Sequence, residues 1–252
     1  MKSLILILTF LTRIPIPYSF EFNENDFKKG IQWAPAIGFV IGLIMALFSY
    51  FMRDYLSNEI LGFIIFLLYI SITGGLHIDG LVDSLDGLYS SRKKDRILEI
   101  MKDSRVGTFG ALGLVVYVLG FVLLAGNLPW EVIFLMPIFG RLTMLQVAAC
   151  GNYARKEGGM GKSIIEYITI KKWILNLFIN IAIISLIGTM YRPHMLVKIL
   201  VSYSLTMAIM YWNTENIIKK IDGITGDILG YSVEISQLIF MIISVIVFGV
   251  MI

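Results

Sequence analysis

The chain has 252 residues, of which 57% are hydrophobic and 15% are charged, and its formal net charge is +3. Soluble domains carry about 25% charged residues, so this composition excludes a soluble protein as well as disordered, collagen-like and disulfide-scaffold chains. A charge of +3 is too small to indicate a nucleic-acid partner. We therefore expect an all-α polytopic membrane protein in contact with lipid, with one domain over residues 1–252.

The first apolar run, residues 4–11, follows Lys2 and resembles the start of a signal peptide. No cleavage site of the small-x-small type comes after it. Instead, Pro15 and Pro17 stand at alternate positions and end any helix there. We expect this run to be retained as a short hydrophobic or re-entrant segment.

Seven later stretches are apolar enough, and about long enough, to cross a bilayer, which takes about 20 helical residues. All four tryptophans fall near the ends of these stretches, where aromatic rings prefer the headgroup layer. Gly38 and Gly42 form a GxxxG pair in the first stretch, which permits close helix packing. The expected spans are 31–52, 60–76, 108–126, 132–150, 173–190, 196–212 and 231–252.

The connections between the spans alternate between basic loops and short loops with few charges. The basic loops, residues 13–30, 77–107, 151–172 and 213–230, carry 16 of the 21 lysines and arginines. The positive-inside rule predicts that they lie in the cytoplasm of a cell-membrane protein. A transporter tends to place polar groups at mid-membrane, in two corresponding halves. Polar residues gathered in loops on one side favour an enzyme at the membrane surface.

The most informative stretch is residues 74–87, where Asp79, Asp83 and Asp86 are spaced i, i+4 and i+7. At about 100° per residue these carboxylates share one helix face and repel one another unless a cation binds. The alternative is a solvated acidic helix end, but no lysine is interleaved to balance the charge. Oxygen ligands without thiolates indicate Mg²⁺ or Mn²⁺ over zinc. Gly80 and Gly87 permit close approach of backbone or substrate phosphate.

Further candidates flank this stretch. His77 lies roughly on the opposite helix face, and is a base, a substrate contact or an interfacial polar residue. Asp103 and Arg105 come just before a span. Arg105 either forms an ion pair with an aspartate or binds a phosphate through a bidentate contact. The amides that begin the next helix would favour the same anion.

Charged residues recur later in the chain. Arg141 lies within an apolar run, where an arginine indicates a functional site, a buried ion pair, or both. Residues 153–163 resemble the end of a P-loop, but Lys156 stands where that motif needs glycine, which excludes nucleotide hydrolysis. This loop either holds a diphosphate or is simply flexible. Asp227 and Glu234 share a face and suggest a second metal shell.

A divalent metal on aspartates, surrounded by arginines, suits transfer of a substituted phosphate from a diphosphate donor to a hydroxyl. CDP-alcohol phosphotransferases of lipid synthesis use this logic. Their signature, DGx₂ARx₈Gx₃Dx₃D, does not match, because Leu-Val-Asp-Ser follows Asp79-Gly80 here. A lipid phosphotransferase of that type and a cation-coupled transporter remain the alternatives.

Six segments in order resemble the cobalamin synthase family, the membrane adenosylcobinamide-GDP ribazoletransferases of bacteria and archaea. The long and specific ones are 74–87 and 100–110, and the others are 10–17, 140–141, 153–155 and 223–230. The resemblance implies attack by a hydroxyl of α-ribazole, or of its 5′-phosphate, on the cobinamide-linked phosphate of adenosylcobinamide-GDP. GMP leaves, and Mg²⁺ is the implied cofactor.

Pattern and resemblance together predict three groups of site residues, and they are compatible with a homo-oligomer. The expected metal ligands are Asp79, Asp83, Asp86 and Asp227. The expected catalytic residues are His77, Asp83, Asp86, Asp103 and Arg105. The expected substrate contacts are Arg13, Gly80, Gly87, Lys102, Arg141, Arg155 and Lys162.

Overall fold

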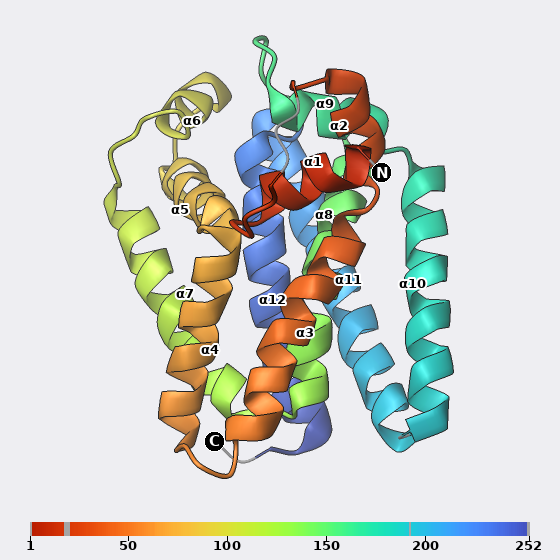
Figure 1. Ribbon diagram of the computed structural model, residues 1–252. Helices are drawn as coiled ribbons and strands as arrows, with labels where there is room; N and C mark the ends of the chain where they lie inside the picture. Colours follow the sequence, from red (N-terminus) through yellow and green to blue (C-terminus); the bar gives the residue numbers. More distant parts are fainter. Residues whose placement is uncertain (1, 18–20, 192, 251–252) are drawn as a thin grey trace.

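A computed structural model describes residues 2–17, 21–191 and 193–250, and this part of the chain forms twelve helices without a β-strand (Figure 1). Five helices are long and apolar enough to cross a membrane. Counting each of two sharply bent helix pairs as one span gives up to seven spans, the number that the sequence predicts. The five are α3 (Ala34–Met52), α7 (Thr108–Asn127), α8 (Trp130–Cys150), α11 (Pro193–Ile221) and α12 (Gly226–Phe248). The pairs are α4 (Asn58–Thr73) with α5 (Leu76–Tyr89), and α9 (Met160–Tyr167) with α10 (Ile170–Tyr191).

The bend between α4 and α5 corrects the predicted span 60–76. Gly74 and Gly75 both adopt the left-handed conformation, with φ of 66° and 70°, which suits glycine because it has no Cβ. Helix α4 therefore ends at Thr73, and α5 departs at 97° from it. Because of this bend, α5 runs across the bundle near one end and packs against α7 and α12 (Figure 1).

The last span also begins earlier than predicted. The Thr225 hydroxyl caps α12 by accepting from the Ile228 amide at 3.2 Å, so the helix starts at Gly226 instead of Tyr231. Asp227 therefore lies in the first turn of a helix. The N-terminal run forms the ten-residue helix α1 (Lys2–Leu11), which packs against α2 (Glu24–Ile31) and α3 at the same end of the bundle as α5 (Figure 1).

The GxxxG pair of α3 packs closely, as predicted, against α8. A Cβ on Gly38 would lie 2.5 Å from the Pro137 carbonyl oxygen, and one on Gly42 would overlap the Phe134 carbonyl. Only glycine admits this approach, so backbone meets backbone along the contact. Helix α8 is almost wholly buried as a result and forms the centre of the bundle.

The four basic loops meet at one end of the bundle, the upper end in Figure 1. Side-chain contacts join them. Ser163 donates to Glu24 at 2.8 Å, and Lys102 pairs with Glu157 at 2.6 Å. Lys94, in α6 (Lys94–Ile100), pairs with Asp222 at 3.1 Å. The predicted gathering of the polar loops on one side is thereby confirmed.

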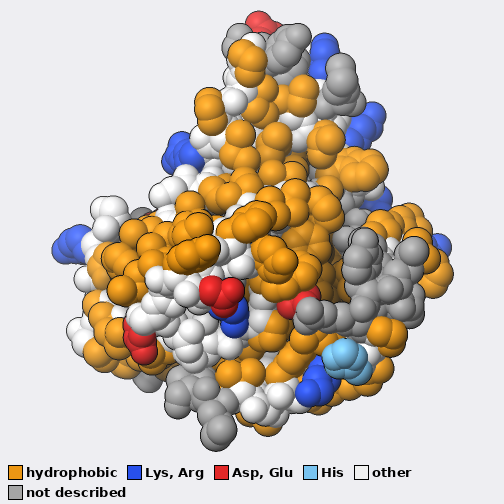
Figure 2. Space-filling view, turned by 60° about the horizontal axis from the view of Figure 1, so that its bottom comes forward, with side chains coloured by type: hydrophobic (Ala, Val, Ile, Leu, Met, Phe, Trp, Pro, Cys, Tyr) orange, Lys and Arg blue, Asp and Glu red, His pale blue; other side chains and the backbone are white. Residues whose placement is uncertain are grey.

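Hydrophobic side chains cover the flanks of the bundle, and charged side chains are scattered thinly among them (Figure 2). Exposed large hydrophobic residues recur along the spanning helices, for example Leu43 and Leu47 of α3, and Val116 and Leu119 of α7. Exposed apolar surface of this extent suits a lipid environment. The fold is therefore that of an integral membrane protein whose polar surface lies mainly at one end.

Candidate functional site

Two glycines bring α5 against the start of α12. A Cβ on Gly80 would lie 2.8 Å from the Asp227 carbonyl oxygen, and one on Gly230 would lie 3.1 Å from the His77 carbonyl oxygen. Gly80 is thus buried in a helix contact instead of facing a substrate. Gly87 is likewise buried, against Met101 after α6. Both positions were predicted as substrate contacts, and the structure uses them for helix packing.

The crossing brings the carboxylates of Asp79 and Asp227 close enough to Asp83 for their charges to act on it. Asp79 is exposed and Asp83 is half-buried. Burial raises the pKa of Asp83 to about 7; the charges of Asp79 and Asp227 add to this rise, and Arg155 opposes it. A carboxylate held among like charges is stabilised in its ionised form by any cation that binds beside it.

Arg155 reaches these aspartates because its loop is tied to the loop before α12. The Ala154 amide donates to the Ile224 carbonyl at 2.9 Å, and the Ile224 amide donates to the Asn152 carbonyl at 2.8 Å. The Arg155 guanidinium then pairs with Asp227 at 2.5 Å. Both side chains are largely buried, so solvent and salt screen their attraction less than that of an exposed ion pair. Arg155 thus lies beside the aspartates, and its predicted contact with substrate phosphate stays a prediction.

Asp86 has a different set of contacts from Asp79 and Asp83. Its carboxylate is buried and accepts hydrogen bonds from the Gly107 amide at 2.7 Å and the Gly110 amide at 2.8 Å. These are amides of the first turn of α7, whose dipole favours a negative charge. Asp86 therefore joins α5 to the start of α7, and its predicted metal and catalytic roles stay predictions.

Across residues 2–17, 21–191 and 193–250, no three His, Cys, Asp or Glu side chains form a ready-made metal cage. Mg²⁺ does not require one, because it is usually held by one or two carboxylates together with substrate phosphates and water. Asp79 and Asp83 offer hard oxygen ligands on an accessible helix face. The donor set therefore fits Mg²⁺ brought in with a phosphate substrate.

Arg105 pairs with Asp103 through a bidentate contact, with Nη2–Oδ2 of 2.6 Å and Nε–Oδ1 of 3.0 Å. These hydrogen bonds lower the pKa of Asp103 to about 2, so this carboxylate is ionised at neutral pH. Of the alternatives for Arg105, the structure contains the ion pair. Both residues also line a cavity of about 770 Å³ between α5, α6 and α7, where a phosphate would compete for the guanidinium.

The remaining predicted basic contacts lie at the same end of the bundle. The exposed Arg13 side chain lies over Gly74, where α4 bends into α5. Lys102 holds Glu157 of the following basic loop. Lys162 is 3.7 Å from Glu166 in the same helix, α9. Arg13 is thus beside the first turn of α5, whereas Lys102 and Lys162 are engaged with carboxylates.

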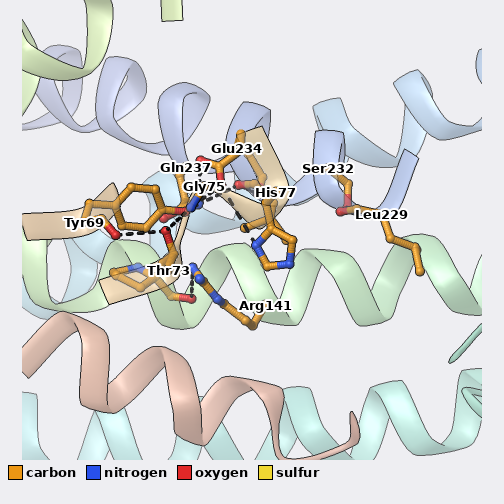
Figure 3. A network of polar contacts seen from close by, with 12 residues as sticks. Tyr69, Thr73, Gly75, His77, Arg141, Leu229, Ser232, Glu234 and Gln237 are labelled. Atoms are coloured by element: carbon orange, nitrogen blue, oxygen red, sulfur yellow. Dashed lines mark hydrogen bonds and ion pairs between the residues drawn. The ribbon is translucent and has the colours of Figure 1, made fainter. Parts of the chain in front are cut away.

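A network of buried polar side chains joins α4, the first turn of α5 and α12 (Figure 3). At its centre the Glu234 carboxylate accepts hydrogen bonds from the hydroxyls of Tyr69, at 2.7 Å, and Tyr117. The Gln237 amide donates to the Tyr69 hydroxyl at 3.0 Å. His77 Nδ1 lies 3.9 Å from Glu234. His77 therefore joins this network on the opposite side of α5 from the aspartates, as its spacing predicts.

Arg141 belongs to the same buried region and is fully inaccessible to solvent. Its Nη1 atom donates to the Pro137 carbonyl at 3.4 Å, and its Cζ atom lies 5.9 Å from the centre of the Tyr69 ring. The side chain does not reach the surface, so its predicted contact with substrate stays a prediction. Among the described residues Arg141 forms no ion pair, and it contacts the Tyr69 ring of the buried network instead.

Two functional candidates were missed by the sequence analysis. Arg92 and Arg96 line the cavity together with Arg105. Their only signal was a cluster of basic residues, which the positive-inside rule already explained. Their convergence with Arg105 on one cavity depends on how the chain runs from the end of α5 through α6 to the start of α7.

Comparison with known proteins gives consistent matches over almost the whole chain. The family model described as cobalamin-5-phosphate synthase matches residues 3–245. A protein of Alkaliphilus oremlandii named adenosylcobinamide-GDP ribazoletransferase is 39% identical over 242 residues, 96% of each chain. Proteins of the same name from Acetivibrio thermocellus, 36% identical with 96% and 97% covered, and Clostridioides difficile, 39% identical with 96% of each covered, also match. No solved structure matches.

Proposed function

This chain belongs to the cobalamin-5-phosphate synthase family, and we propose that the site at the end of its bundle is the active site of an adenosylcobinamide-GDP ribazoletransferase. The observation that carries the proposal is the meeting of α5, the start of α12 and the Arg155 loop. This crossing gathers carboxylates and an arginine where a diphosphate can reach them. It is formed by the segments that carry the family resemblance.

In the proposed reaction, a hydroxyl of α-ribazole, or of its 5′-phosphate, attacks the cobinamide-linked phosphorus of adenosylcobinamide-GDP. A phosphorus–oxygen bond to the acceptor forms, the bond to the bridging oxygen breaks, and GMP leaves. The products are adenosylcobalamin, or its 5′-phosphate, and GMP. The hydroxyl proton passes to solvent or to a carboxylate of the site that does not hold the cation.

The residues of the site divide this work among them. Asp79 and Asp83 would hold Mg²⁺ on the diphosphate. Asp227 would join them once a phosphate oxygen replaces it as the ion-pair partner of Arg155. Bound in this way, Mg²⁺ would neutralise charge on the phosphoryl oxygens and the leaving group. Arg155 and Arg105 act as guanidinium clamps on the same oxygens. Asp86 keeps the first turn of α7 in position beside them.

The proposal predicts GMP release from adenosylcobinamide-GDP by the purified chain in detergent or lipid vesicles. Release should depend on both α-ribazole and Mg²⁺. CDP-diacylglycerol with an alcohol acceptor serves as the control donor, and it should give no CMP. GMP release without α-ribazole, or CMP release from the lipid donor, would contradict the assignment.

We further propose that the site faces the cytoplasm across the cell membrane, which the gathering of basic loops at that end supports. In a Cys150→Ser background, Lys156→Cys lies at the active end and Asp54→Cys lies in the exposed turn at the other end. A membrane-impermeant maleimide should label Asp54→Cys in intact cells and Lys156→Cys only after lysis. The reverse pattern would mean that the site faces outward.

A further inference from the structure

The cavity of about 770 Å³ beside the aspartates is large enough for more than a phosphate. It lies between the C-terminal end of α5, helix α6 and the first turn of α7. Small-molecule sites in proteins have volumes of about 300–1,000 Å³. Asp86 lines the cavity, and it comes one helical turn after Asp83. A diphosphate bound at Asp79 and Asp83 can therefore extend directly into this cavity.

Three arginines give the cavity its charge. Arg92, Arg96 and Arg105 all line it, and each presents a planar guanidinium that suits phosphate oxygens. Arg96 and Arg105 are paired with Glu99 and Asp103, each at 2.7 Å or less. In the part of the chain that the structure describes, no ion pair is recorded for Arg92, so it is available to an anion. The Asp86 charge is already satisfied by the α7 amides.

The same cavity has an apolar wall made of Ile100, Val106 and Phe109. Phe109 is 48% exposed, and its ring centre lies 6.0 Å from that of Tyr89, which is 59% exposed. An exposed aromatic ring next to guanidinium groups is a surface on which a planar base can stack. Phosphate-binding and base-binding features thus occur side by side in one cavity.

We propose that this cavity binds the guanosine monophosphate portion of the donor, the part that leaves in the reaction. Arg92 and Arg96 hold its phosphate, and Phe109 contacts the base. Negative charge develops on the leaving phosphate as the bond breaks, so cations are most effective on that side. This inference rests on the proposed function, and it assigns to Arg92, Arg96 and Phe109 a role in donor binding.

The test is GDP binding to the full chain in detergent with Mg²⁺, measured by calorimetry and independent of turnover. The double variant Arg92→Gln, Arg96→Gln should bind GDP at least tenfold more weakly. The matched control, Lys171→Gln with Lys219→Gln, removes the same charge from exposed positions that do not line the cavity and should bind within twofold of the parent. Phe109→Leu should weaken GDP binding at least threefold and leave pyrophosphate binding unchanged.

Steady-state kinetics then identify the substrate. The KM for adenosylcobinamide-GDP should rise at least tenfold in the arginine double variant, with the KM of α-ribazole 5′-phosphate unchanged. A rise confined to the α-ribazole 5′-phosphate KM would assign the cavity to the acceptor and overturn the proposal. So would GDP affinity within twofold of the parent. If the parent binds GDP through these arginines but releases no GMP, the proposed function fails while the nucleotide site stands.

Discussion

Replacing Asp83 by asparagine should lower GMP release at saturating Mg²⁺ by at least a hundredfold. On α5, Asp83 lies where the charges of Asp79, Asp227 and Arg155 all act on its carboxyl group. The amide of asparagine keeps the shape but supplies no negative charge to hold a cation on the diphosphate. Loss of one preorganised electrostatic contact typically costs about 10²–10³ in turnover.

Asp54→Asn is the matched control, because Asp54 is exposed in the turn after α3, at the end of the bundle away from the site. It should retain full activity. An Asp83→Asn variant that keeps activity within threefold of the parent would refute the metal role of this residue. Thermal unfolding of both variants separates a local chemical effect from loss of fold.

Calorimetric binding of Mg²⁺ gives a second signature of Asp83. With a pKa of about 7, this carboxyl is largely protonated at pH 6 and ionised at pH 8. Mg²⁺ binds the ionised form, so affinity should rise over this interval in the parent. The pH dependence should be lost, or greatly reduced, in Asp83→Asn. An unchanged dependence would assign the titrating group to another residue.

The sequence predicted the membrane bundle, the one-sided basic loops and the α5 face, because each follows from local patterns of hydropathy, charge or helical period. It missed the bend at Gly74 and Gly75, because the apolar sequence runs on past Thr73 while the backbone of these two glycines adopts the left-handed conformation. It also did not predict the hydrogen bonds of the Asp86 carboxylate. The partner of that carboxylate, the first turn of α7, is set by how two helices meet and not by spacing within either one.

Glycine shows the same limit. The spacing of Gly38 and Gly42 predicted close helix packing, which the contact with α8 confirms. Gly80 and Gly87 were interpreted as phosphate contacts because they adjoin aspartates, yet they pack against α12 and Met101. A glycine that admits a substrate and one that admits a helix look alike in the sequence. Only the position of the neighbouring element distinguishes them.

Glu234→Gln should be among the most destabilising conservative substitutions in this chain. Glu234 is 1% exposed and is held by two tyrosine hydroxyls, while Arg141, completely buried, lies on the other side of Tyr69. Glutamine keeps the shape but leaves the arginine charge without a counter-charge. The two charges do not touch, but each acts on the other across Tyr69, and leaving a buried charge without compensation costs up to about 3–5 kcal/mol. In a chain of this size that corresponds to a fall in Tm of about 10 °C.

A double-variant cycle tests whether the charges are coupled. Arg141→Met alone should also destabilise, since it leaves the Glu234 carboxylate buried without its cation. The combination Arg141→Met with Glu234→Gln removes both charges and should recover part of the lost Tm, because replacing a buried pair by neutral groups of similar volume is often tolerated. Strictly additive losses would show that the two charges act independently. His77, in the first turn of α5, lies beside Glu234, so the single Glu234→Gln variant should also lower activity by displacing Asp79 and Asp83 on the same helix. If both the Tm and GMP release are unaltered in this variant, the network has no supporting role.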